Sequence, residues 1–216
     1  MNLYERVYQD YPQSPLAGYA LYRVAVNSDR FFDFDKAVQS YLLFYEKYEG
    51  QNPDTLRDMG FDVAERRQTA LRGAAVLTEN LQRYPDAARL YEQYVRAYPG
   101  AEDTESVQWQ AVQNWKKAGD FNRMMAAINT YRRNYGARPE NSERVLEGMT
   151  MIADHYAESK NNRKALSWYR DIVKEYRTRG LAKGAPGAYF AAKARFLLAE
   201  EDFQRWDKIQ IKGNMK

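Results

Sequence analysis

The stretch YEQYVRAYP at residues 91–99 has a similar counterpart at residues 4–12, where the chain reads YERVYQDYP with the same first two and last two letters. A segment that recurs in a chain of 216 residues indicates an array of repeated units, and the period of that array decides the fold class. The identical pairs are Tyr4 and Tyr91, Glu5 and Glu92, Tyr11 and Tyr98, and Pro12 and Pro99.

Five segments of the chain end on a tyrosine in this same context. Apolar or aromatic residues stand at the first, fourth and eighth letters of each segment, which is the i, i+3, i+7 stripe of a helix. A proline, a glycine or a polar turn follows, as at the end of a helix. The closing residues are Tyr11, Tyr48, Tyr98, Tyr135 and Tyr176, which lie 37, 50, 37 and 41 positions apart.

A second marker, mostly a small residue inside an apolar stripe, follows the same series. The stretch AGYALYRVA at 17–25 aligns with AAKARFLLA at 191–199, so that their last alanines are equivalent. Two markers that move together predict a repeated pair of helices, and no alternating apolar pattern predicts a strand beside them. The equivalent residues are Ala25, Ala75, Val112, Ala153 and Ala199, with separations of 50, 37, 41 and 46.

The markers divide the chain into one array of units. In this division the chain starts and stops inside a unit, so we expect it to be a fragment of a longer protein. The second unit carries 13 more residues than a spacing of 37 (50 − 37), and Asn52-Pro53-Asp54 reads as a helix start. We therefore expect its first helix to extend back to Asp54. The expected elements are a second helix of a truncated unit at 3–12, units at 15–48, 54–99, 103–136 and 141–178, and a first helix of a further unit at 187–209.

Residues 71–99 resemble a tetratricopeptide repeat. In that frame Ala75 matches the small residue of the first helix, and the second helix supplies Ala87, Tyr91, Tyr94 and Pro99 as small, aromatic, packing and terminating residues. The resemblance implies an all-α solenoid of antiparallel helix pairs in a right-handed superhelix. Two helices 8–10 Å apart need small residues where they touch. The larger Val112 and Met124 therefore predict a splayed third pair.

The composition excludes several kinds of chemistry. The chain has no cysteine, so disulfides, thiolate catalysis and cysteine-bound metals are absent. The net charge of +4 arises from 33 basic and 29 acidic residues that are mixed along the chain, unlike the concentrated basic stripe of a nucleic-acid-binding protein. No stretch approaches the run of about 20 apolar residues that crosses a bilayer. We expect neither nucleic acid nor a membrane span.

Two features invite a catalytic interpretation, and neither supports one. His155 is the single histidine, and its neighbour Asp154 points about 100° away on a helix, so that it is poorly placed to orient the imidazole ring. The loop GLAKGAPG at 180–187 lacks the GxxxxGK[ST] order of a phosphate-binding loop and follows no predicted strand. We predict a protein without enzymatic activity, cofactor or metal.

The repeat frame places a set of aromatic and polar side chains on the inner face of the first helices. Repeat superhelices bind ligands in the groove that this face lines, and exposed Trp and Tyr are frequent anchors in interfaces. The adjacent Lys116 and Lys117 could bind a carboxylate or a phosphate, or could form a solvated face. The predicted groove residues are Tyr19, Tyr22, Arg72, Trp109, Gln113, Lys116, Lys117, Thr150 and Phe196.

We therefore predict a non-enzymatic scaffold that binds a protein or peptide partner inside a larger assembly. The Tyr-rich endings resemble repeat proteins of the bacterial envelope, and FAAKARFLLAEEDF at 190–203 resembles large repeat proteins of gliding-motility complexes. That resemblance implies a location in the periplasm or at the outer membrane, with the cytoplasm as the alternative. The alternative functions are the helical, non-catalytic region of an envelope enzyme such as a cell-wall hydrolase, and a purely structural spacer.

Overall fold

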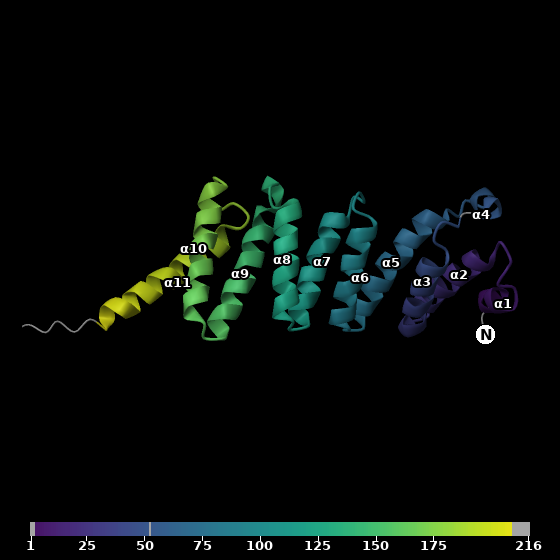
Figure 1. Ribbon diagram of the computed structural model, residues 1–216, viewed down its shortest axis with the longest axis horizontal. Helices are drawn as coiled ribbons and strands as arrows, with labels where there is room; N and C mark the ends of the chain where they lie inside the picture. Colours follow the sequence, from purple (N-terminus) through teal and green to yellow (C-terminus); the bar gives the residue numbers. More distant parts are fainter. Residues whose placement is uncertain (1–2, 52, 209–216) are drawn as a thin grey trace, which may run out of the picture. The chain divides into compact units, whose positions relative to one another are not determined.

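The computed structural model describes residues 3–51 and 53–208, and this part of the chain is all-α, as predicted. Eleven α-helices and one short 3-10 helix account for its regular structure, and these residues include no strand. The chain divides into two compact units, Met1–Asp120 and Phe121–Lys216. Figure 1 shows the helices of both units.

The first unit is a series of helices in which each long helix packs against the one before it. Its second helices are amphipathic and begin at a polar or proline-containing turn, as at Asp33, whose side chain accepts from the Lys36 backbone. The helices are α1 (Leu3–Asp10), α2 (Ala17–Arg30), α3 (Phe34–Lys47), α4 (Asp54–Asp58), α5 (Val63–Asn80), α6 (Tyr84–Ala97) and α7 (Thr104–Lys117).

Small residues allow α2 and α3 to approach closely. Ala25 of α2 and Ala37 of α3 are fully buried. A Cβ added at Gly18 would lie 2.9 Å from the Cε1 atom of Tyr48, so the ring of that tyrosine occupies the space a side chain would need. The repeated small residues thus stand at helix contacts, as the sequence predicts.

The segment before α5 differs from the prediction, and the expected continuous helix from Asp54 is wrong. The helix α4 ends after one turn, and Gly60 adopts a left-handed backbone with φ of +71°. The Phe61 amide then donates to the Leu56 carbonyl at 2.8 Å, and Asp62 caps α5 by accepting from the Glu65 amide. This turn buries Leu56 and Phe61 in the core of the first unit, which a straight helix would not achieve.

The second unit contains α8 (Phe121–Tyr135), the 3-10 helix η1 (Pro139–Asn141), α9 (Ser142–Glu158), α10 (Asn162–Thr178) and α11 (Ala188–Asp207). Glycine again marks close contacts. A Cβ at Gly148 of α9 would lie 2.9 Å from Ile128 Cγ2 of α8, and one at Gly187 would meet Leu146 at the same distance. Gly187 also has a φ of +90°, which favours glycine before α11. Residue 209, the predicted end of the last helix, lies outside the described residues.

The boundary between the two compact units lies inside the predicted third helix pair, between α7 and α8. This is the pair that contains the larger Val112 and Met124. The division into repeat units and the handedness of a superhelix stay predictions.

Candidate functional site: a polar pocket of the first unit

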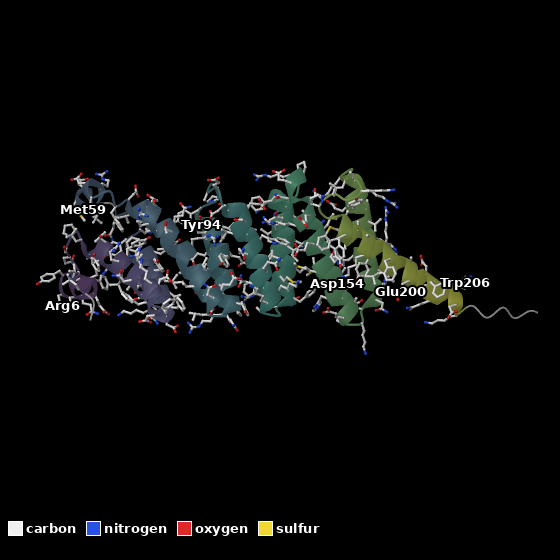
Figure 2. The ribbon with its side chains drawn as sticks, turned by 180° about the vertical axis from the view of Figure 1, so that it is seen from behind. Arg6, Met59, Tyr94, Asp154, Glu200 and Trp206 are labelled. Carbon is white, nitrogen blue, oxygen red and sulfur yellow. The ribbon has the colours of Figure 1, made fainter. Side chains whose placement is uncertain are left out.

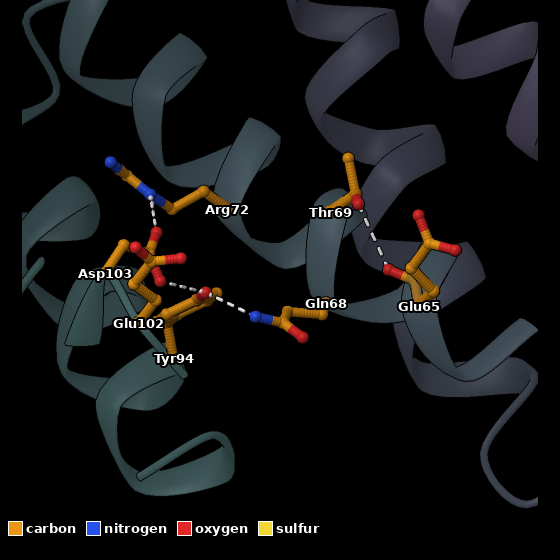
Figure 3. Close-up of a pocket in the computed structure, with 7 residues that line it drawn as sticks. All are labelled: Glu65, Gln68, Thr69, Arg72, Tyr94, Glu102 and Asp103. Carbon is orange, nitrogen blue, oxygen red and sulfur yellow. Dashed lines mark hydrogen bonds and ion pairs between the residues drawn. The ribbon is translucent and has the colours of Figure 1, made fainter. Parts of the chain in front are cut away.

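A pocket of about 600 Å³ opens in the first unit between α5, α6 and the turn that precedes α7. Every residue that lines it carries a polar group, and the set includes three carboxylates and one guanidinium (Figure 3). Charged groups of this kind suit a hydrophilic segment of a partner better than an apolar small molecule. The lining residues are Glu65, Gln68, Thr69, Arg72, Tyr94, Glu102 and Asp103.

Tyr94 lies at the centre of the hydrogen bonds in this pocket. Its hydroxyl donates to Asp103 Oδ1 at 2.6 Å and accepts from Gln68 Nε2 at 2.7 Å. Arg72 Nε donates to the other carboxylate oxygen of Asp103 at 3.1 Å. Side chains from α5 and α6 therefore hold the Asp103 carboxylate in one orientation (Figure 3).

The guanidinium of Arg72 is partly withdrawn from the pocket. Its Nη1 atom is buried and has no hydrogen-bond partner among the described residues. The guanidinium lies over the Tyr91 ring, 5.5 Å from the ring centroid, and this cation–π contact helps to hold the Arg72 side chain in place. A buried donor left unpaired costs roughly 1–3 kcal/mol.

A second polar cluster adjoins the pocket through Tyr91. The hydroxyl of Tyr91 donates to Glu79 at 2.8 Å, and Lys117 Nζ donates to the same carboxylate at 2.7 Å. Lys117 also lies 5.3 Å from the centroid of the Tyr84 ring. The lysine is thus held against α5 and α6.

The environment shifts the pKa of the groups in these clusters. Burial raises the pKa of Tyr91 and of Tyr94, and the hydrogen bonds that their hydroxyls donate to Glu79 and Asp103 raise both further. For Glu79, burial acts to raise the pKa, but the hydrogen bonds from Lys117, Tyr91 and Asn114 outweigh it, and the pKa is lowered. Both tyrosines therefore stay protonated near neutral pH, as donors to ionised carboxylates.

Three predicted groove residues are buried, so Tyr22 and Trp109 are not exposed aromatic anchors and Thr150 does not line an open groove. Tyr22 packs edge-on against Tyr41 and Phe44 of the adjacent second helix and is 9% exposed. Trp109 is buried too. Thr150 is buried and donates its hydroxyl to the carbonyl of Leu146, a bond within its own helix. Tyr22 lies three residues before Ala25, so it faces the same partner helix; this spacing was the signal of its burial.

The other predicted groove residues are in different surroundings. Tyr19 is half-buried against the rings of Tyr4 and Phe61. Gln113 is half-buried and Lys116 is exposed. Thr150 and Phe196 belong to the second unit, where Phe196 is strongly exposed. Arg72 is the predicted residue that lines the pocket, whereas the pocket acids were missed. The acidic pair Glu102-Asp103 directly before the Thr104 helix start was the available signal.

His155 has a packing role in the second unit. Its ring stacks on Phe121 with centroids 3.6 Å apart and 9° between the planes. Asp154 does not orient it, because that carboxylate accepts from Tyr169 at 3.0 Å and from Lys193 at 2.6 Å. Over residues 3–51 and 53–208, no group of three or more His, Asp or Glu could hold a metal ion. No helix in this described part is long and apolar enough to cross a membrane.

Comparisons with known proteins bear on the fold alone. No family model and no curated protein matches the chain. A crystal structure of BtubC (BKLC) from P. vanneervenii is similar over 99% of this chain and 91% of that chain, with 14% identity and a TM-score of 0.42. The crystal structure of Podosopora anserina putative kinesin light chain nearly identical TPR-like repeats is similar over 96% and 92%, with 12% identity and a TM-score of 0.47. At these values neither likeness carries an argument about function.

Proposed function

We propose that this protein is a non-enzymatic scaffold whose first unit binds a basic, hydrophilic segment of a protein partner in the pocket between α5 and α6. The observation that carries the proposal is the acidic rim of this pocket. Glu65 and Glu102 stand exposed at its edge.

This rim selects the charge of a partner. The carboxylates of Glu65 and Glu102 attract a Lys or Arg side chain, and their exposure makes that attraction sensitive to salt. Asp103 adds negative charge, although its oxygens are already shared by Tyr94 and Arg72. A peptide with a basic side chain therefore fits this rim.

The assembly that contains such a partner is a further part of the proposal. The resemblance of the tyrosine-rich endings to bacterial envelope proteins supports a complex in the periplasm or at the outer membrane. No residue of the pocket bears on that location.

A binding assay with two matched peptides tests the pocket. A fluorescein-labelled lysine–serine peptide is titrated with the 216-residue chain, and a glutamate–serine peptide serves as its opposite-charge control. We expect anisotropy to rise with the lysine peptide alone, and binding to weaken as salt increases from about 50 to 200 mM.

Neutral substitutions locate the binding. The double variant Glu65→Gln, Glu102→Gln keeps the side-chain shapes at two exposed positions and should weaken lysine-peptide binding by about two- to thirtyfold, given roughly 0.2–1 kcal/mol per exposed charge. Glu46→Gln, an exposed acid on α3, should leave it unchanged. Equal weakening in both variants, or preference for the glutamate peptide, contradicts the proposal.

A further inference from the structure

Gln68 belongs to the wall of the pocket in the first unit, and its side-chain amide is fixed in one orientation. The hydroxyl of Tyr94, a residue labelled in Figure 2, has a single hydrogen, and Asp103 Oδ1 receives it at 2.6 Å. The Gln68 atom that lies 2.7 Å from the same hydroxyl oxygen is therefore the amide nitrogen, which donates. The amide oxygen, Gln68 Oε1, is left as an acceptor, and it has no hydrogen-bond partner in the part of the chain that the structure describes.

The other hydrogen bonds in this pocket also use donors and leave acceptors. Thr69 donates its hydroxyl hydrogen to the Glu65 backbone carbonyl at 3.1 Å, so its oxygen offers only lone pairs to a ligand. Arg72 Nε donates to Asp103 Oδ2 at 3.1 Å, and this ion pair compensates the charge of Arg72. A ligand group with several donors and no acceptor therefore complements the pocket best.

The two exposed acids at the rim differ in their surroundings. Glu65 Oε1 lies 3.5 Å from Nη1 of Arg66, its neighbour on α5. Glu102 makes no ion pair within residues 3–51 and 53–208. Figure 3 shows the Gln68 amide between Glu65 and the Glu102–Asp103 pair. Gln68 Oε1 and the Glu102 carboxylate are thus two acceptors that line one pocket and still lack a donor.

An arginine side chain matches two separate acceptors better than a lysine side chain does. Its guanidinium carries five N–H donors in a planar fork and no acceptor, so it can bind two oxygens at once. The ammonium group of lysine is a compact, strongly hydrated point charge without such a fork.

We infer that Gln68 makes this pocket selective for arginine over lysine, an inference that rests on the proposed binding of a basic segment. In the complex, a guanidinium of the bound segment donates to Gln68 Oε1 and to the Glu102 carboxylate. Tyr94 and Asp103 are positioning residues for this contact, because their hydrogen bonds hold the Gln68 amide with its oxygen free.

Two fluorescein-labelled peptides of equal length, one arginine–serine and one lysine–serine, test the selectivity with the 216-residue chain. The ratio of their two dissociation constants is measured by anisotropy, because a general loss of structure weakens both peptides equally and leaves this ratio unchanged. We expect the arginine peptide to bind about two- to tenfold more tightly, which is the effect of one hydrogen bond.

The variant Gln68→Met locates the selectivity. Methionine keeps the length and the helix propensity of glutamine but has no amide oxygen, so the ratio of the dissociation constants should fall toward one. Gln39→Met makes the same change at an exposed position of α3 and should keep the ratio of the unsubstituted chain. Circular dichroism checks that both variants are folded.

The outcomes separate this inference from the proposed function. Equal binding of both peptides by the unsubstituted chain overturns the selectivity and leaves the proposed function in place. Binding of neither peptide overturns both. A preference for arginine that Gln68→Met leaves unchanged overturns the role of Gln68, because the preference then arises from other residues.

Discussion

The hydroxyl of Tyr94 donates to Asp103 Oδ1 at 2.6 Å, and this bond ties α6 to the turn that begins the next helix. Arg72 and Gln68 join the same two residues from α5. A tyrosine read from the sequence as a packing residue thus also organises the polar pocket.

Replacing Tyr94 by phenylalanine should destabilise the protein while keeping its packing. The ring is buried and stays, but Asp103 and Gln68 lose a partner. A hydrogen bond to a charged group contributes about 1.5–3 kcal/mol, so we expect a loss of that order in the free energy of unfolding, measured in urea. Tyr189→Phe, at an exposed position, should change it by less than about 0.5 kcal/mol. Equal stability of the two variants contradicts the role given to the Tyr94 hydroxyl.

Two helical glycines should respond to alanine in opposite directions. A Cβ at Gly73 would lie 3.4 Å from Tyr41, an ordinary contact, so Gly73→Ala should stabilise the protein by about 0.5–1 kcal/mol through helix propensity. A Cβ at Gly18 would lie 2.9 Å from Tyr48, and overpacking there costs about 1–3 kcal/mol. Gly18→Ala should therefore destabilise on balance. Thermal unfolding of the pair measures both signs, and two stabilising substitutions would refute the close contact at Gly18.

The sequence predicts the helices and their small contact residues well because both follow from local periodicity. Ala25, Ala37 and Ala87 are fully buried where the repeat frame puts them. The frame fails at Tyr22 because a first helix contacts two neighbouring helices. Periodicity shows that the helix has apolar faces, but it does not show which neighbouring helix covers each face. The helix predicted from Asp54 is interrupted for a similar reason. The turn at Gly60 buries Phe61 in the core, and the local sequence pattern does not contain this tertiary contact.

The pocket depends on relationships that no local pattern contains. Gln68, Tyr94 and Asp103 come from three segments and meet because α5, α6 and α7 stack in order.

Glu79 should make the protein less stable in acid. Its pKa is lowered in the folded state, so its contribution is fully present above the ordinary value of 4.5 and is lost as pH falls through the folded pKa. Glu79→Gln should remove that part of the pH dependence, so that the difference in unfolding free energy from the unsubstituted chain shrinks below pH 4.5. Urea unfolding between neutral pH and the acid range measures this. An undiminished difference in acid would show that the ionised carboxylate contributes nothing.

Tyr48 should make the protein less stable in alkali. Burial raises its pKa from the ordinary 10.0 to about 12, and its hydroxyl is buried with no hydrogen-bond partner among the described residues. The unfolded chain then loses the phenolic proton before the folded one does. The stabilising contribution is complete below pH 10 and disappears as pH rises through about 12.

In Tyr48→Phe nothing titrates at this position, so its unfolding free energy should fall less steeply above pH 10 than that of the unsubstituted chain. The control is Tyr189→Phe, which removes the hydroxyl of an exposed tyrosine, and its curve should follow that of the unsubstituted chain. Parallel curves for Tyr48→Phe and the unsubstituted chain would mean that the Tyr48 pKa is the same in the folded and unfolded states.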